Sequence, residues 1–371
     1  MNVMHTKAAV QTDSKQSVVH SRYGFTAVII ILMIITILSA GAAVSFGQVE
    51  IPVSQSYRIL LHHITGIQIG DIQDLTSGSF VDIIWKIRFP RVLMAMFIGA
   101  GLTLCGTIMQ AAVQNPLADP YILGISSGGS LGATFAILIG FGSMGLLGQT
   151  GVAFWAFGGA VGASLLVLLL ANAGGKMTSV KLVLAGMVIN ALCTAFANFI
   201  VYFANNAEGI KTVTFWTMGS LAASSWDKLP LIAIAVCLAS LFFLLQFRTL
   251  NTMLLGDEAA VTLGISLGAY RKLYMIITAL ITGIMVAGCG MIGFVGLIIP
   301  HLVRGLVGSD HRRLLPTSIL IGSIFLIWTD VIARTIVPNV ELPIGIITAL
   351  IGAPMFMYML VKKGYAFGGK S

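Results

Sequence analysis

The run YGFTAVIIILMIITILSAGAAVSFGQV, from Tyr23 to Val49, contains no charged residue. A helix needs roughly 20 apolar residues to cross a hydrocarbon core about 30 Å thick, whereas the apolar part of a signal peptide has only about 7 to 15. We therefore interpret this run as a retained membrane span, although Lys7, Lys15 and Arg22 precede it as in a signal peptide. The whole chain is 57% hydrophobic and 9% charged, against roughly 25% charged residues in soluble proteins. The composition excludes a water-soluble domain and predicts an all-α polytopic membrane protein.

Further uncharged windows place the other spans. Two of them are divided: the long 120–175 window at its Gly-rich middle, Gly140 to Gly151, and the 273–303 window into two short helices that meet near Gly288 to Gly296. The prediction is about ten transmembrane helices. The windows are 23–49, 92–118, 120–175, 182–207, 229–247, 273–303, 314–329 and 342–361.

The basic residues set the predicted orientation. With both termini in the cytoplasm, fourteen of the 21 Lys and Arg residues lie inside and seven outside, as the positive-inside rule expects. The formal charge of +8 is spread singly or in pairs between apolar runs, which favours topology determinants over a nucleic-acid surface. We expect a lipid bilayer and no nucleic acid as partners, and a multi-pass protein of the bacterial cytoplasmic membrane.

The expected organisation is one membrane domain with short tails. Residues 1–22 form a cytoplasmic tail, 23–363 the transmembrane domain and 364–371 a second cytoplasmic tail. Two segments interrupt the spans: Thr212 to Leu221 is predicted as a short helix at the outer mouth, and Leu250 to Ser266 as a cytoplasmic loop with helical character. The role of the long outer loop 47–82 stays open.

Several motifs resemble catalytic or cofactor sites without the context that such sites need. Gly364 to Ser371 matches G-x-x-x-x-G-K-[ST] at the chain end, and Gly288 to Gly293 matches G-x-G-x-x-G between two spans, but a phosphate site needs a strand before the loop and a helix after it. His62, His63 and His301 lack Asp, Glu or Cys at ligand spacing and are interpreted as structural. The four isolated cysteines (Cys105, Cys193, Cys237 and Cys289) are interpreted as packing residues. We expect no cofactor, no metal site and no enzymatic activity.

Small residues and two acids have two interpretations each. Glycines at spacings of four allow close contact between the third and fourth spans, either for movement as units or for static packing: Gly124, Gly128, Gly132, Gly158 and Gly162. Asp330 and Glu341 flank the outer end of the ninth span and could carry a coupled ion. We favour charge pairing instead, for example between Asp330 and Arg334 at i, i+4.

A series of longer strings, in order along the chain, resembles one family. They are Ile87-Arg-Phe-Pro-Arg91, Gly99 through Gln110, Gln114-Asn-Pro-Leu-Ala-Asp-Pro-Tyr-Ile-Leu-Gly-Ile-Ser-Ser-Gly128, Trp216-Thr-Met-Gly-Ser-Leu221, Leu255-Gly-Asp-Glu-Ala-Ala260, Gly293 through Arg304 and Glu341 through Pro354. The chain resembles, from about residue 25 to 363, the permeases of ABC importers for iron-siderophore complexes, haem and cobalamin.

This resemblance implies the fold of a type II importer permease and a set of partners. A second permease subunit, identical or related, would complete a central pathway. Two cytoplasmic ATPase subunits would drive it, and an extracytoplasmic binding protein would deliver the cargo. The implied function is import of an iron chelate, either a ferric siderophore or haem, with cobalamin as the alternative.

The resemblance also assigns roles to particular residues. The fifth span and the 212–221 helix would line the pathway, through Asn190, Asn198, Trp216, Met218, Gly219 and Ser220. The loop 250–266 would dock on the ATPase, through Leu255, Gly256, Asp257, Glu258, Ala259, Ala260, Leu263 and Gly264. Arg88, Arg91 and Arg334 would form salt bridges with carboxylates of the binding protein, or else reach lipid headgroups. An ATP-independent secondary transporter is the competing class, and it would not require the cytoplasmic loop.

Overall fold

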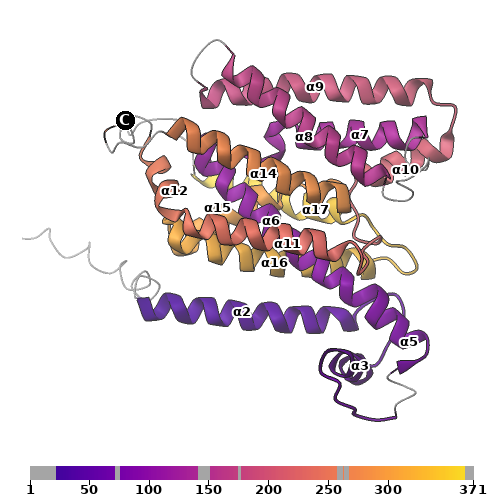
Figure 1. Cartoon of the computed structure of the whole chain (residues 1–371). Helices are drawn as coiled ribbons and strands as arrows, with labels where there is room; N and C mark the ends of the chain where they lie inside the picture. Colours follow the sequence, from indigo (N-terminus) through magenta and orange to yellow (C-terminus); the bar gives the residue numbers. More distant parts are fainter. Residues whose placement is uncertain are drawn as a thin grey trace, which may run out of the picture.

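The computed structural model describes residues 22–71, 76–140, 151–173, 177–256, 262 and 267–363. Helices run nearly antiparallel across the molecule (Figure 1). Six of them are long and apolar enough to cross a membrane: α2 (Arg22–Ser45), α6 (Phe89–Val113, continuous with a preceding π-helical turn), α8 (Gly151–Asn172), α9 (Ser179–Phe203), α14 (Leu267–Cys289) and α16 (His311–Thr335).

The remaining spans are shorter or bent. Helix α11 (Leu229–Leu245) joins α12 (Phe247–Leu254) through a bend of 63°, and the pair counts as one further span. Shorter apolar helices are α7 (Ile125–Ile139), α15 (Val295–Val307) and α17 (Ile344–Lys363). These ten helices correspond one to one with the ten spans predicted from the eight uncharged windows, so the predicted fold class is confirmed.

Helix α6 lies at the centre of the bundle, in contact with α11, α14, α15 and α16. Its glycines permit this position, since a Cβ atom at Gly106 would lie 1.9 Å from the carbonyl oxygen of Gly296, and one at Gly99 would lie 2.3 Å from that of Gly322. Close backbone contact of this kind is how helices associate in lipid. A larger side chain at either position would force α15 or α16 away from the core.

Helices α7, α8 and α9 form a second layer beside this core (Figure 1). Two of the predicted packing glycines hold it together: Cβ atoms at Gly128 and Gly132 would meet the carbonyl oxygens of Gly159 and Trp155 on α8. Gly158 has open space around it, and so has Gly162, so the prediction is wrong for these two. The close-packed glycine of α8 is Gly159, one residue further, because one residue rotates a helix face by about 100°.

The chain between α14 and α15 is non-helical yet enclosed. Unpaired backbone groups are costly at membrane depth and are tolerated only where protein satisfies them. The Tyr121 hydroxyl lies 3.2 Å from both the amide nitrogen and the carbonyl oxygen of Ile292, and the amide of Ser220 donates to the carbonyl of Cys289. The predicted break between two helices near 288–296 is therefore confirmed. The packing interpretation of the G-x-G-x-x-G string holds for Gly290, whose Cβ would lie 2.3 Å from the Trp216 carbonyl oxygen, but not for Gly293, which has open space around it.

Short helices mark the two ends of the bundle. Helices α3 (Val53–Thr65), α5 (Ser79–Val81) and α10 (Ala207–Thr217) lie at one end, and α12 lies at the other together with the first turn of α2 (Figure 1). The predicted 212–221 helix exists but begins at Ala207, where the Asn206 side chain accepts a hydrogen bond from the Gly209 amide. It ends at Thr217, shortly before Gly219 takes a positive φ of 72°.

Three of the four cysteines are packed in the interior, as predicted. Cys105, Cys193 and Cys289 are buried, whereas Cys237 lies on the exposed face of α11, where the packing interpretation is wrong. None of the four is paired in a disulfide. The predicted tails, apart from Arg22, and the Gly-rich turn at 141–150 lie outside the described residues.

Candidate functional site

One face of α9 carries polar side chains that no neighbouring helix covers within the described residues. Asn190, Thr194 and Asn198 are exposed and follow each other at i, i+4 spacing, which places them in one strip. The adjoining face, with Leu182, Ile189 and Cys193, is buried against α7 and α8. Polar side chains such as the asparagine amides normally face a protein interior or a water-filled path, rather than lipid, when they lie inside a membrane segment. The exposed strip is therefore a candidate pathway wall, and Thr194 is a member that sequence reasoning missed.

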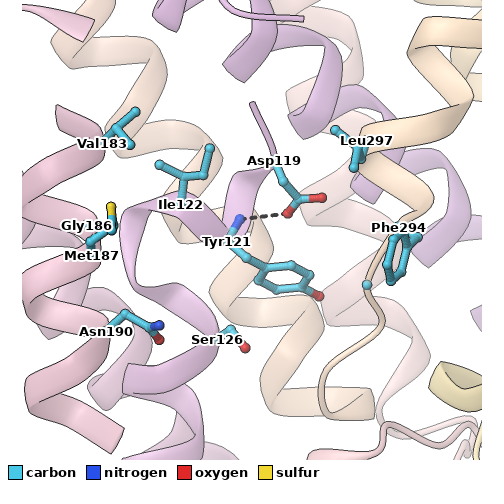
Figure 2. Close-up of a pocket in the computed structure, with 11 residues that line it drawn as sticks. Asp119, Tyr121, Ile122, Ser126, Val183, Gly186, Met187, Asn190, Phe294 and Leu297 are labelled. Atoms are coloured by element: carbon cyan, nitrogen blue, oxygen red, sulfur yellow. Dashed lines mark hydrogen bonds between the residues drawn. The ribbon is translucent and has the colours of Figure 1, made fainter. Parts of the chain in front are cut away.

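A cavity of about 460 Å³ opens beside this strip (Figure 2). Asn190 and Met187 of α9 line one side, and Phe294 and Leu297 line the opposite side. The short 3₁₀ turn Pro120–Leu123 forms the floor, and the Asp119 carboxylate caps it by accepting a 2.9 Å hydrogen bond from the Tyr121 amide. The lining is mostly apolar with a few polar groups, which is typical of sites for organic ligands.

The segment after α10 borders a second cavity of about 510 Å³, lined by Met218 and by Met291, Gly293 and Gly345. Gly293 lines both cavities, so Asn190 and Met218 are brought to neighbouring spaces. Gly219 cannot carry a side chain here, because its Cβ would lie 2.2 Å from the Met291 carbonyl oxygen. The structure thus brings together the predicted residues Asn190 and Trp216 to Ser220 around the 289–294 break. Asn198 lies two turns further along α9.

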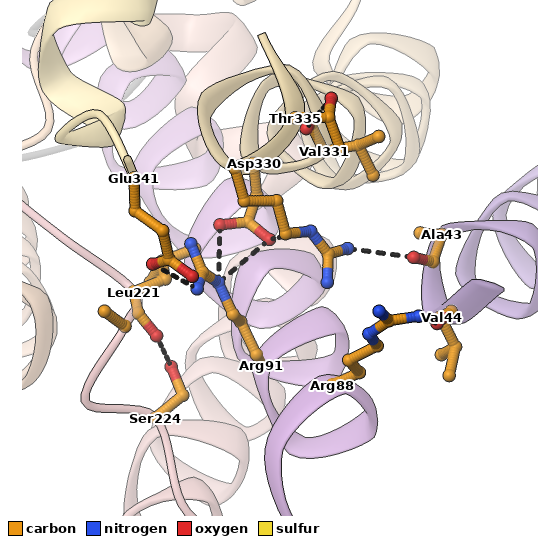
Figure 3. Close-up of polar contacts among 12 residues, drawn as sticks. Ala43, Val44, Arg88, Arg91, Leu221, Ser224, Asp330, Val331, Thr335 and Glu341 are labelled. Carbon is orange, nitrogen blue, oxygen red and sulfur yellow. Dashed lines mark hydrogen bonds and ion pairs between the residues drawn. The ribbon is translucent and has the colours of Figure 1, made fainter. Parts of the chain in front are cut away.

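A cluster of buried charges lies near the N-terminal end of α6 (Figure 3). Arg91 Nε lies 2.9 Å from Asp330 Oδ1, and Arg91 Nη1 lies 2.8 Å from Glu341 Oε2. Arg334 Nε lies 3.4 Å from Asp330 Oδ2. Only 5% of Arg91 and 3% of Arg334 is exposed, and Asp330 is fully buried. The predicted pairing of Asp330 with Arg334 is confirmed, and Arg91 joins it from 239 residues away.

Arg334 and a third arginine, Arg88, connect α2 to the core. Arg334 Nη2 donates to the Ala43 carbonyl at 2.9 Å, and Arg88 donates to the carbonyls of Val44, Ser45 and Val49. These acceptors include the carbonyls of the last turn of α2, which have no partner within the helix. All three guanidinium groups therefore contact groups of this chain. Their predicted salt bridges with a binding protein stay a prediction, and in this structure the side chains are buried rather than presented to a partner.

At the opposite end of the bundle, hydrogen bonds connect α12 to two spans. Asn251 Nδ2 donates to the Asp310 carboxylate at 2.7 Å, and Asn251 Oδ1 accepts from the His311 amide at 2.8 Å. Gln114, after α6, donates to the Met253 carbonyl at 2.8 Å. Burial opposes ionisation of Asp310, but the hydrogen bonds from Asn251 and from the Arg312 amide together lower its pKa. α12 is thereby connected to α6 and α16.

The predicted ATPase-docking residues follow α12. Leu255 is exposed, and Gly256 has a φ of 91° that favours glycine. Asp257, Glu258, Ala259, Ala260, Leu263 and Gly264 lie outside the described residues. Their role stays a prediction.

These features define an integral membrane transport subunit, with a polar wall, an enclosed helix break and no soluble domain within the described residues. The chain belongs to the FecCD transport family, whose family model matches residues 29–362. Members of this family are permease subunits of ABC transporters and are not themselves enzymes.

Relatives and a solved structure agree with this assignment. The chain is 38% identical to the hemin transport system permease HmuU of Yersinia pestis over 78% of this chain and 87% of that protein. It is 38% identical to the vitamin B12 permease BtuC of Citrobacter koseri, covering 76% and 83%, and 34% identical to the molybdate permease MolB of Haemophilus influenzae, covering 89% and 94%. An inward-facing metal-chelate type ABC transporter has a TM-score of 0.75 at 30% identity, covering 91% of this chain and 99% of that one.

Proposed function

We propose that this chain is the permease of an ATP-driven importer that carries an iron chelate, a ferric siderophore or haem, across the cytoplasmic membrane. The observation that carries the proposal is the uncovered strip Asn190, Thr194 and Asn198 beside two neighbouring cavities. A large amphiphilic chelate requires a wall that is apolar with scattered hydrogen-bonding groups.

Charge argues for a chelate over a bare oxyanion. Neither cavity is lined by Arg or Lys within the described residues, and Asp119 adds a carboxylate to the first one. An oxyanion such as molybdate would find no counter-charge there and would be repelled. The haem relative and the metal-chelate transporter support an iron chelate, and the vitamin B12 relative leaves cobalamin as the alternative cargo.

A second permease subunit would complete the pathway. Two exposed hydrophobic residues of α9 lie beside the polar strip: Met187 precedes Asn190 by three residues, and Tyr202 follows Asn198 by four. Helix α17 exposes Leu350 and Met357. Apolar surface that flanks a polar strip suits contact with another membrane helix. We propose that two such chains face each other across α9 and α17, with the amides of both strips toward the shared path.

Energy would enter through the loop that follows α12. The ATPase is a separate subunit in this proposal, and Leu255 to Gly264 would dock in a groove on its surface. Movement of that loop would reach α16 through Asn251 and Asp310, and α6 through Gln114. An extracytoplasmic binding protein would deliver the chelate at the end where α10 lies, with Arg88, Arg91 and Arg334 as its candidate contacts.

Uptake by whole cells tests the cargo. A strain lacking this gene would be given ⁵⁵Fe-labelled siderophore complexes, ⁵⁵Fe-haem and ⁵⁷Co-cobalamin in parallel, with and without the gene restored. The proposal expects that one iron chelate is taken up only when the gene is present. Gene-dependent uptake of cobalamin alone would overturn the cargo assignment.

Residue-level variants then test the wall. Asn198→Leu removes a hydrogen-bonding group from the exposed strip, whereas Leu192→Ala changes an exposed apolar residue of the same helix outside the Asn190, Thr194 and Asn198 strip. We expect slower uptake in Asn198→Leu at unchanged protein level and near-normal uptake in Leu192→Ala. Equal rates in both would contradict a pathway role for the strip.

A further inference from the structure

Helix α3 lies across the end of α2 and away from the core. Figure 1 shows α3 nearly end-on below the end of α2, whereas α2 runs across the view. The helix begins after Pro52 and ends at Gly66, whose amide donates to the His62 carbonyl. It lies in the outer loop 47–82, to which neither the resemblance nor the proposed pathway gives a role.

The contact between Tyr57 and α2 fixes the depth of α3. The Tyr57 ring packs on Gly41, where a Cβ would lie 3.4 Å from Tyr57 Cε1. Gly41 precedes the last residue of α2, Ser45, by about one helical turn. Helix α3 therefore lies level with the final turn of a membrane span, which is the depth of the interfacial region of a bilayer.

The face of α2 beneath this contact is open. Ile34, Ile37 and Leu38 precede Gly41 by seven, four and three residues, so they share its face of the helix. Their exposed fractions are 50%, 71% and 64%. Helix α2 lies on the opposite side of the molecule from α9, the proposed contact with a second subunit (Figure 1). An exposed apolar face on a membrane-spanning helix suits contact with acyl chains, and α3 lies across the end of this face.

Helix α3 itself has three sides. Ile59 and Leu60 are buried against the protein, and Arg58 and Thr65 are exposed on the polar side. Between them runs an apolar edge of Val53, Tyr57 and Ile64, exposed by 56%, 45% and 60%. A helix with one apolar edge, one polar side and a position in the interface is typical of amphipathic helices that lie in a membrane surface.

Aromatic residues hold α3 at this level. The His63 ring lies 4.7 Å from Trp85, which lies 4.9 Å from Trp226, and Trp226 Nε1 donates to the Trp85 carbonyl at 2.8 Å. Tryptophan is enriched where membrane spans meet the headgroup region. The cluster connects α3 to the start of α6 and the start of α11.

We propose that α3 is an interfacial helix whose edge of Val53, Tyr57 and Ile64 inserts among the lipids of the leaflet at the α10 end. The surface continues the lipid-facing stripe of α2, which identifies lipid as its occupant. Its position in the membrane surface would hold the end of α2 at a constant depth in the bilayer. The α2 carbonyls that Arg88 and Arg334 bind would be held at the same depth. This inference does not depend on the cargo.

Spin-label accessibility tests the proposal on the full-length protein in liposomes. Single cysteines would replace Val53 and Ile64 on the apolar edge, and Ser54 and Thr65 on the polar side as matched controls. Only Cys237 needs prior replacement by Ala, because the other native cysteines are buried. Power saturation would compare collisions with oxygen, which concentrates in lipid, and with a water-soluble nickel chelate.

We expect oxygen collisions to exceed nickel collisions at positions 53 and 64, with the reverse at 54 and 65. Equal or greater nickel accessibility at positions 53 and 64 would overturn the proposal, because the edge would then face water. An immobile spectrum at 53 and 64, shielded from both reagents, would also overturn it and would indicate coverage by protein. Each labelled side chain is already exposed, so the substitutions should leave the fold intact.

Discussion

Replacing Asp330 with Asn should destabilise the protein by several kcal/mol. Asp330 is the shared partner of two buried guanidinium groups, with Arg91 Nε at 2.9 Å and Arg334 Nε at 3.4 Å. Removing one partner of a buried ion pair costs about 3 to 5 kcal/mol, because the other charge is left uncompensated. Arg91 would keep Glu341 at 2.8 Å, whereas Arg334 would keep only the Ala43 carbonyl. We therefore expect about 3 kcal/mol, the lower end of the range.

Unfolding by SDS titration in mixed micelles can measure this difference in free energy. The matched control is Lys86→Gln, which removes the exposed Lys86–Asp82 pair at 2.7 Å. Exposed pairs contribute about 0 to 1 kcal/mol. The double variant Asp330→Asn with Arg334→Met tests the cause, since it removes the uncompensated cation together with its partner. Stability in the double variant should recover toward the wild-type value.

An Asp330→Asn variant that is no less stable than Lys86→Gln would refute this reasoning. Such a result would mean that Arg91 and Arg334 are solvated in the membrane-embedded protein. The two arginines would then be available to carboxylates of a binding protein, as the family resemblance implies. One comparison thus separates the structural role of the cluster from the docking role.

Three more predictions concern packing, coupling and topology. Gly132→Leu should destabilise the α7–α8 layer, because its Cβ would lie 2.0 Å from the Trp155 carbonyl oxygen, whereas a Cβ at the control position Gly158 has no atom within 4 Å. Thermal unfolding monitored by size-exclusion chromatography compares Gly132→Leu with Gly158→Leu, and equal midpoints would contradict the packing. Asn251→Ala should lower transport per ATP hydrolysed without loss of folded protein, since it removes the polar contacts of α12 with Asp310 and His311 at the start of α16. Unchanged stoichiometry in proteoliposomes would exclude this connection. Cysteine labelling should place Lys211 outside and Arg312 inside the cell, and inside labelling at Lys211 would contradict the ten-span topology.

The number of spans was predictable from the sequence because lipid imposes a simple rule. A segment that crosses hydrocarbon must be apolar and about 20 residues long, and the uncharged windows mark such segments directly. The same rule misplaced the start of α10. The uncharged window opens only after Lys211, but the helix begins at Ala207, with Glu208 in its first turn. A negative charge at a helix N-terminus is favourable, so Glu208 does not argue against a helix start here. Asn206, a residue type that caps helix N-termini, was the sequence signal for a start at Ala207.

Contacts between distant segments were not predictable. The i, i+4 spacing revealed the pairing of Asp330 with Arg334, since both lie on one helix. No local pattern connects Arg91 to Asp330, which lies 239 residues away. The positive-inside rule described Arg88, Arg91 and Arg334 as unusual outer cations, and only the tertiary structure shows that they bind carboxylates and the carbonyls at the end of α2.

The candidate pathway was predictable only in part. The two asparagines of α9 were identified from the sequence, but the exposure of their face depends on which side of α9 packs against α7 and α8. The glycine spacing likewise predicted that two helices lie in close contact, but it identified the wrong face of α8. Gly159 rather than Gly158 makes the contact, because helix rotation is decided by all the packed residues together.

The source of energy is the central claim, and the competing class is an ion-driven transporter that uses Asp330 or Glu341. In the structure Asp330 is fully buried and paired with Arg91 and Arg334, and Glu341 is paired with Arg91. The most direct measurement is the initial rate of uptake of the ⁵⁵Fe-labelled chelate by proteoliposomes containing the permease with its ATPase and binding protein. The account predicts uptake with ATP on the ATPase side, inhibition by vanadate and no uptake with an imposed proton gradient alone. Uptake driven by the gradient without ATP would contradict it.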